Sequence, residues 1–138
     1  ARFLRISPMN FDSIAAKIDT KTAANEGAKM EVRDAAGVLL TKPDGTPITI
    51  ILLGRDSDTF VKQENANTNR RLAQGPRLKL TAEALKSEAI SLLARCTVAW
   101  DFDEDCTYEN ARELYTRFPA IKEQADEFIA DRANFTKA

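Results

Sequence analysis

The residues that could support chemistry are few in this chain of 138 residues. Histidine, the commonest general base and metal ligand near neutral pH, is absent. Its absence excludes serine–histidine and cysteine–histidine nucleophilic catalysis. The five glycines stand singly at expected turns, so the chain has no glycine-rich loop for a phosphate or a dinucleotide. We therefore expect no catalytic residue and no cofactor, and we predict that the protein is not an enzyme.

An acidic run that begins at Asp101 copies the start of a calcium-binding loop. Asp101, Asp103 and Asp105 stand at the first three ligand positions of such a loop. The sixth position, which requires glycine, is Cys106, and the twelfth, which requires a bidentate glutamate, is Arg112. A solvated acidic loop is therefore the favoured interpretation, and no metal site is expected.

The two cysteines and the aromatic residues near them have structural interpretations. Cys96 and Cys106 are ten positions apart, without the paired spacing of a zinc knuckle or a redox motif. Cys96 lies on an apolar stripe and is expected in the core. Trp100 and Phe102 flank the acidic run, and they either close the core or offer an anchor to a partner.

A basic cluster between residues 62 and 79 is interleaved with asparagines that could read bases. It has no aromatic residues for base stacking, and the chain has 20 basic against 21 acidic residues, a net charge of −1. An exposed polar helix face is favoured over a nucleic-acid site, and a protein-binding face remains open. The cluster consists of Lys62, Arg70, Arg71, Arg77 and Lys79.

The N-terminal part of the chain is expected to form a small sheet. Residues 11–27 predict a short, weak helix that ends at a glycine. Alternation at residues 30–32 and 38–40 predicts two strands, and the Asp-Gly pair within residues 42–47 predicts a tight turn. Residues 48–53 form the strongest expected strand.

Four helices are expected after that strand. The first covers residues 57–74, with Asp56 or Ser57 as its cap. The second, residues 81–99, should be the central helix, capped by Thr81 and striped with apolar side chains. Thr107 caps a third, and a first-turn proline begins the fourth. The apolar positions of the last three helices are Leu80, Ala84, Leu85, Ala89, Leu92, Leu93 and Cys96, then Ala111, Leu114, Tyr115 and Phe118, then Ile121, Ala125, Phe128 and Ile129.

The expected architecture is an α+β domain with a small N-terminal antiparallel sheet followed by about four helices. Residues 9–138 form this single domain. Residues 1–8 precede Met9 and look unlike the rest of the chain, so we interpret them as a remnant ahead of the native start. They lack the features of a secretory signal, which favours a cytoplasmic location. No run approaches the roughly 18 apolar residues that cross a bilayer, so no membrane partner is expected.

Several segments resemble the tail assembly chaperones of long-tailed phages and prophages. They are DTKTAANEG at residues 19–27, IILLGRDSD at residues 50–58, ENARELY at residues 109–115, Phe118-Pro119, and FIADRANF at residues 128–135. The resemblance implies a protein of the host cytoplasm that coats the tape-measure protein, keeps its helices from aggregating and helps to recruit the tail tube protein. Many proteins of this family also exist as a longer form made by translational frameshifting, and this chain would fit the short form. The resemblance is also compatible with a homo-oligomer.

The predicted partner-binding face lies on the sparse helix at residues 57–74. This helix has too few apolar residues to be fully packed, and Phe60, Val61 and Leu72 are expected about one helical face apart. Interface energy concentrates in aromatic and arginine side chains, so Arg70, Arg71 and Trp100 are also predicted to bind the partner. The alternative functions are a minor tail or head–tail joining protein of the virion and an unrelated adaptor. The predicted partner-binding residues are Phe60, Val61, Arg70, Arg71, Leu72 and Trp100.

Overall fold

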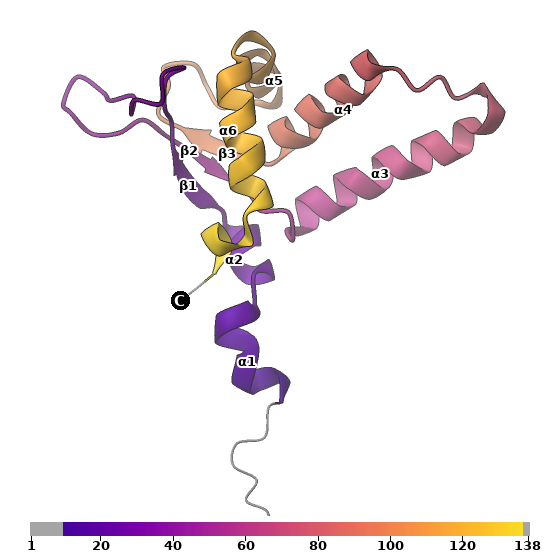
Figure 1. The fold of residues 1–138 in the computed structure, drawn as a ribbon, viewed down its shortest axis with the longest axis horizontal. Coiled ribbons are helices and arrows are strands. Elements are labelled where there is room, and N and C mark those ends of the chain that lie inside the picture. The colour runs from indigo at the N-terminus through magenta and orange to yellow at the C-terminus, as the bar shows by residue number, and fades with distance from the viewer. Residues whose placement is uncertain (1–9, 137–138) are drawn as a thin grey trace, which may run out of the picture.

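The computed structural model describes residues 10–136, which form a mixed α+β fold (Figure 1). Interpretations of residues 1–8 therefore lie outside the described residues. A three-stranded sheet stands beside α5 and α6, while α3 and α4 extend away from it as a long hairpin. The elements are α1 (Phe11–Ile18), α2 (Lys21–Glu26), β1 (Ala28–Glu31), β2 (Thr49–Leu52), α3 (Asp58–Gln74), α4 (Ala82–Arg95), β3 (Thr97–Trp100), α5 (Tyr108–Arg117) and α6 (Pro119–Ala130), with 3-10 turns at Gly75–Arg77 and Arg132–Phe135.

The sheet is antiparallel, in the order β1-β2-β3, and Met30, Ile50 and Trp100 face one another across it. The sequence-based helix at residues 81–99 is therefore wrong at its end, because α4 stops at Arg95 and residues 97–100 pair with β2. Strand β2 has an open edge that only a further strand can satisfy, and this pairing outweighs one more helical turn. The sheet is consequently not strictly N-terminal.

The segment between β1 and β2 forms two hairpin turns with little regular strand. Predicted strand 38–40 makes only an isolated bridge, between Arg33 and Leu39, and a second bridge joins Thr41 to Pro47. Val38 is 61% exposed, whereas Leu40 packs against the core, so only the inner part of this hairpin is held against the body. The predicted turn at residues 42–47 is confirmed, with Gly45 at a φ of 89°.

The predicted helix at residues 11–27 is two helices, α1 and α2. The Asp19 side chain accepts hydrogen bonds from the amides of Lys21 and Thr22, at 3.0 and 3.4 Å, and so starts a new helix. Gly27 ends α2 at a φ of 92°, and a Cβ there would stand 2.9 Å from Ile51 Cγ2. A glycine is thus required where α2 meets the sheet.

The local helix signals near residues 57, 81 and 107 are confirmed. Ser57, Thr81 and Thr107 each accept a hydrogen bond from the amide three residues later, at 3.0 to 3.1 Å. Pro119 occupies the first turn of α6, as predicted. These boundaries depend on neighbouring residues only, which is why the sequence predicts them well.

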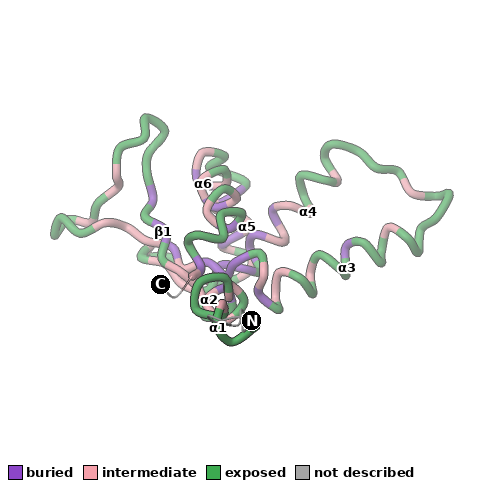
Figure 2. Tube along the Cα trace, turned by 60° about the horizontal axis from the view of Figure 1, so that its bottom comes forward, coloured by how far each residue is buried: buried purple, intermediate pink, exposed green. Residues whose placement is uncertain are grey.

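The core lies where the sheet, the C-terminal half of α4, α5 and α6 meet (Figure 2). The apolar stripe predicted for the second helix holds only in this half, because Leu80 and Leu85 are 54% and 42% exposed. Leu80 precedes α4, and the N-terminal half of α4, which holds Leu85, extends beyond the body. The buried core comprises Met30, Val32, Ile50, Leu52, Leu53, Ile90, Leu93, Ala94, Cys96, Ala111, Tyr115, Ile121, Ala125 and Ile129.

A polar pair inside this core joins β3 to α5. The Thr97 hydroxyl donates to the Leu93 carbonyl oxygen at 2.9 Å and lies 2.7 Å from the Tyr115 hydroxyl. Thr97 has one hydroxyl proton, so Tyr115 must be the donor to Thr97 Oγ1. Burial raises the pKa of Tyr115, which keeps that proton in place.

This donor order predicts unequal effects for Tyr115→Phe and Thr97→Val. The first removes one hydrogen bond and should cost about 1 kcal/mol, whereas the second strands the buried Tyr115 hydroxyl and should cost about 2 to 3 kcal/mol. The double variant should cost less than the sum of the two. Urea denaturation of the three variants measures these free energies, and an equal cost for both single variants would contradict the donor order.

Candidate functional site

The hairpin of α3 and α4, which we call the arm (residues 58–95), is anchored at its base. Phe60 packs against the core, and Asn67 is the only buried residue of α3. Asn67 Oδ1 accepts hydrogen bonds from Gln63 Nε2 at 3.1 Å and from an Arg70 guanidinium nitrogen at 3.0 Å. A buried amide with two donors aligns one face of α3 without adding apolar packing.

An ion pair joins the two helices farther out. The Arg71 guanidinium contacts both carboxylate oxygens of Glu88, at 2.6 and 3.1 Å, and Arg70 lies 3.7 Å from the same carboxylate. Glu88 is mostly buried, with 17% of its side chain exposed. The guanidinium of Arg71 and the carboxylate of Glu88 form a bidentate contact. Arg71 thereby joins α3 to α4 and holds the arm together.

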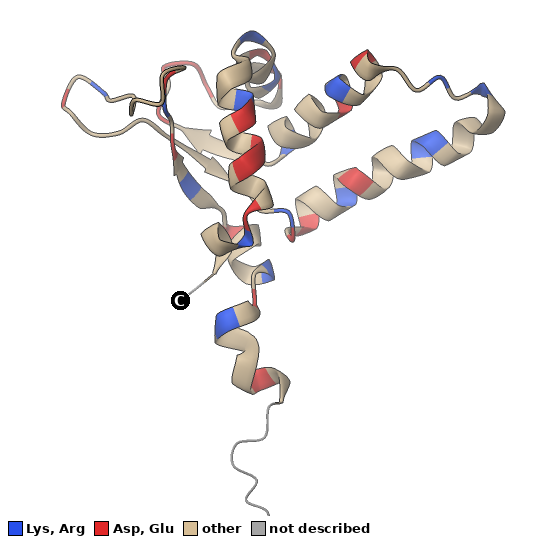
Figure 3. Cartoon of the chain, in the orientation of Figure 1, with Lys and Arg blue, Asp and Glu red and all other residues tan. Residues whose placement is uncertain are grey.

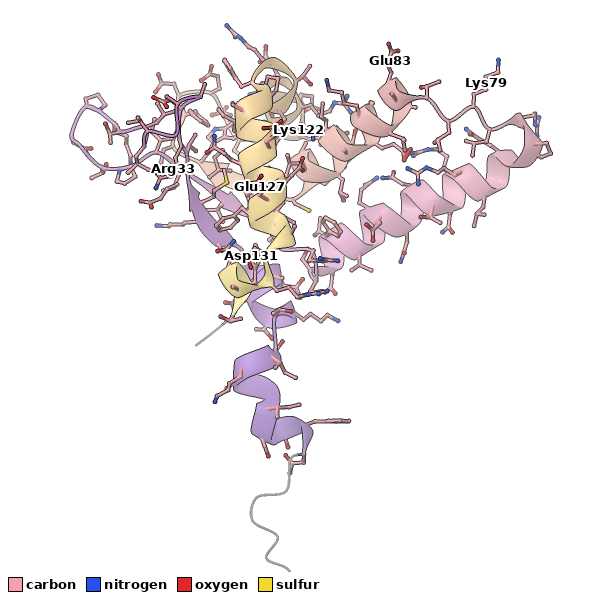
Figure 4. All side chains as sticks on the ribbon, in the orientation of Figure 1. Arg33, Lys79, Glu83, Lys122, Glu127 and Asp131 are labelled. Atoms are coloured by element: carbon pink, nitrogen blue, oxygen red, sulfur yellow. The ribbon has the colours of Figure 1, made fainter. Side chains whose placement is uncertain are left out.

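Beyond this pair, the outer arm (residues 72–86) contains no buried residue. Leu72 on α3 is 73% exposed, and it is joined by Leu80 in the connecting segment and Leu85 on α4. Lys79 and Glu83 point away from α3 into solvent (Figure 4). Both signs of charge occur along the arm (Figure 3), but within the predicted basic cluster only Lys62 is separated from the others by an acidic residue, Glu64. Arg70, Arg77 and Lys79 line one hollow on its outer part. The outer arm is thus a projecting helical surface of exposed leucines and mixed charge.

The predicted partner-binding residues of α3 do not share one face. A helix turns 100° per residue, so Val61 and Leu72 lie only about 20° apart, whereas Phe60 lies about 120° from Leu72. Accordingly Val61 is 44% exposed, while Phe60 turns toward the core. Val61 and Leu72 belong to the free face, and Phe60 belongs to the anchor.

Trp100 lies away from the arm, in a second surface feature. This groove has a volume of about 560 Å³ and runs between the first hairpin turn and the junction of α5 with α6. Its apolar lining includes Leu40, Trp100, Phe102, Leu114 and Phe118. Its charged rim is formed by Arg33, Asp34, Glu104, Glu113 and Arg117.

The aromatic pair in this groove both closes the core and faces the surface. The Trp100 and Phe102 rings meet edge to face, with centroids 5.5 Å apart, and both pack against the core. The Trp100 indole donates to the Glu104 carbonyl oxygen at 2.7 Å. The expectation that these residues close the core is therefore met by both rings, and their role as an anchor for a partner stays a prediction. The groove itself has no sequence signal, because it depends on how a hairpin meets two helices.

The acidic loop is tied to the sheet through its first residue. Asp101 accepts hydrogen bonds from the Thr49 amide and hydroxyl, at 2.8 and 2.9 Å, and lies 3.5 Å from Lys42. These donors lower the pKa of Asp101. Its carboxylate is thereby engaged in closing the end of β2. Within residues 10–136, no group of three or more acidic or cysteine side chains is placed to hold a metal ion.

At the base of the arm, the Asp56 side chain contacts one segment from the N-terminal part of the chain and one from the C-terminal part. Arg132 donates two hydrogen bonds to this carboxylate, at 2.7 and 2.9 Å, and the Thr20 hydroxyl donates a third. These bonds lower the pKa of Asp56 to about 2. One carboxylate thus joins the segment before α2, the start of α3 and the C-terminal turn.

Burial also determines the state of the cysteines. It raises the pKa of Cys96 to about 12 and raises that of Cys106 to a smaller extent. Both are free thiols, and Cys96 lies in the core as expected. Neither side chain has the electropositive surroundings that produce a nucleophilic thiolate.

Comparison of the chain with models of known protein families, with curated proteins and with solved structures gives no match. In the part of the chain that the structure describes, no helix is both long and apolar enough to cross a membrane. Function must therefore be inferred from the arm, from the groove and from the resemblance of the sequence segments.

The Asp56 joint predicts a specific pH dependence. Its pKa is lowered in the folded state, from 3.8 to about 2, so its contribution to stability is complete above pH 4 and is lost as the pH falls through 2. Asp56→Asn should be less stable than wild type at neutral pH, and the difference should shrink toward pH 2. Urea midpoints against pH measure this, with Asp103→Asn as the control. A difference that is constant with pH would contradict it.

The Arg71–Glu88 pair predicts that Glu88→Gln loosens the arm without unfolding the core. A part-exposed pair contributes about 1 kcal/mol or less, so amide hydrogen exchange in the outer arm should quicken a few-fold. Exchange in α5 should be unchanged. Glu83→Gln, an exposed position on the same helix, is the matched control. Equal exchange in the two variants would show that the pair does not hold the arm.

Proposed function

We propose that this protein is a non-enzymatic tail assembly chaperone of a long-tailed phage or prophage, which acts in the host cytoplasm. In this proposal its outer arm binds a helical segment of the tape-measure protein reversibly, and the tail tube protein is a further partner. The observation that carries the proposal is the set of exposed leucines on a projecting helical hairpin, Leu72, Leu80 and Leu85. The sequence resemblance supplies the class of client.

The exposed leucines limit how tightly one arm can bind. Fully burying a leucine stabilises by about 1.5 to 3 kcal/mol, and these three side chains are each roughly half exposed or more. Covering them would contribute about 3 to 5 kcal/mol before the cost of association, which is well short of the roughly 8 kcal/mol of a micromolar complex. Additional contacts along the client are needed, and each single arm binds weakly. Weak, repeated binding suits a chaperone that must leave its client.

A helical client fits this surface better than an extended one. The arm offers two helices joined by a connecting segment at residues 75–81, and the free face of α3 carries Val61 and Leu72 eleven residues apart. An amphipathic helix can place its apolar stripe on such a face, with its polar side in water. An extended segment would instead seek a free sheet edge.

The test is co-expression with the tape-measure protein of the same genome, followed by co-purification. In the double variant Leu72→Asp/Leu80→Asp, the amount of soluble client that co-purifies should fall at least tenfold, because both new carboxylates would lie in the contact. Thermal stability should change little, since both positions are more than half exposed. Val38→Asp, an exposed apolar position on the far hairpin, is the matched control. Arg71 is unsuitable for this test because it holds the arm.

Full recovery of soluble client with the double variant would remove the arm as the binding surface. If the wild-type protein neither binds nor solubilises any tail protein of that genome, the chaperone function is wrong. Presence of the protein in finished particles would favour the alternative, a minor tail or head–tail joining protein. Mass spectrometry of purified particles decides between these two.

A further inference from the structure

Helix α1 is capped at its N-terminus and has an exposed apolar stripe. The Asn10 side chain accepts from the Ser13 amide at 2.9 Å, and Asp12 and Lys17 match the two ends of the helix dipole. Yet α1 has no buried residue, and Phe11 and Ile18 are 90% and 63% exposed. An isolated helix of eight residues is marginal in water, so caps alone do not account for it. Contact with a second surface that covers the apolar stripe would stabilise this helix.

The groove beside Trp100 has the form and charge that this stripe needs. Its volume of about 560 Å³ is in the range of about 300 to 1,000 Å³ that is usual for binding pockets, and its floor is apolar. Phe11, Ile14 and Ile18 stand at positions i, i+3 and i+7, on one side of α1. The rim holds both signs of charge, which complements the one acidic and one basic side chain of α1.

The chain cannot place α1 in its own groove. Thr20 is bonded to Asp56, which also binds Arg132 beyond the C-terminal end of α6, so Ile18 is held two residues from that joint. The groove is lined by Pro119 and its neighbours, at the opposite end of α6. Helix α6 has twelve residues and is about 18 Å long, whereas all of α1 spans about 12 Å. Figure 1 shows α1 extending away from the body on that side.

We propose that α1 of one chain docks in the groove of a second copy, and that the second copy returns its own α1. The apolar stripe of α1 covers Trp100 and Phe118, and its two charged side chains meet the rim. Because each copy gives and receives the same contact, the assembly closes as a two-fold dimer. The proposal is independent of the client, since the arm takes no part in it.

The experiment uses the full chain alone. Trp100 is the only tryptophan, so its emission reports on the groove directly. Wild type should sediment as a dimer that dissociates on dilution, with a red shift of the emission as Trp100 becomes wetter. Phe11→Asp should be monomeric at all concentrations with the red-shifted emission. Ala16→Asp, on the opposite side of the same helix, is the matched control and should remain dimeric.

A groove variant locates the receiving surface. Phe118→Asp should also be monomeric, and this position is 43% exposed, so the fold should tolerate the charge. Mixing it with Phe11→Asp restores one intact helix–groove pair, and the mixture should form a dimer that neither variant forms alone. A monomeric mixture, a dimeric Phe11→Asp variant or a monomeric wild type would each overturn the proposal. If the Trp100 emission of wild type shifts to the blue only after a client peptide is added, the groove binds the client, and the proposal is overturned.

Discussion

Strand β2 occupies the middle of the sheet, and this position sets the course of the chain before and after it. Its two edges must both be paired, and the chain supplies β1 from before it and β3 from well after it. Everything between β2 and β3 is therefore a single excursion that leaves the sheet and returns to it. The excursion is the arm, and its two ends are held while its outer part is free. An exposed helical surface follows directly from the strand order.

Polar contacts then hold the parts that apolar packing does not reach. Asp56 joins the base of the arm to α2 and to the C-terminal turn, and Asp101 closes the end of β2. The Thr97–Tyr115 pair connects β3 to α5 inside the core. Each of these groups is satisfied by more than one partner, so the body stays rigid while the arm and α1 extend from it. Rigid support with free extensions is a suitable arrangement for binding.

The two surfaces differ in what they can bind. The outer arm presents exposed leucines on a helical hairpin, which favours contact along the side of another helix. The groove beside Trp100 is concave and apolar, and it can enclose a short stripe of side chains. Their separation would allow the proposed self-association and the proposed client binding to use different elements. Arg71 illustrates how close the two roles of support and binding lie, because a side chain expected at an interface is bonded within the chain.

The elements that depend on local interactions can be predicted without the tertiary fold. The caps at Ser57, Thr81 and Thr107 and the first-turn proline of α6 each act within four residues, so the α+β class and most helix boundaries were predictable. The sparse apolar content of α3 likewise predicted a helix partly in solvent. These signals need no knowledge of where the chain returns.

Features that join distant segments have no local signal and arise from the way the whole chain packs. Residues 97–100 follow a helical stripe, and only the open edge of β2 makes them a strand. Leu80 and Leu85 continue the same apolar spacing as the core positions of α4, yet Leu80 precedes this helix and the half of it that holds Leu85 lies beyond the body. The groove and the Arg71–Glu88 pair bring together residues far apart in the sequence. Periodicity records which side of a helix is apolar, but what lies against that side is a property of the whole fold.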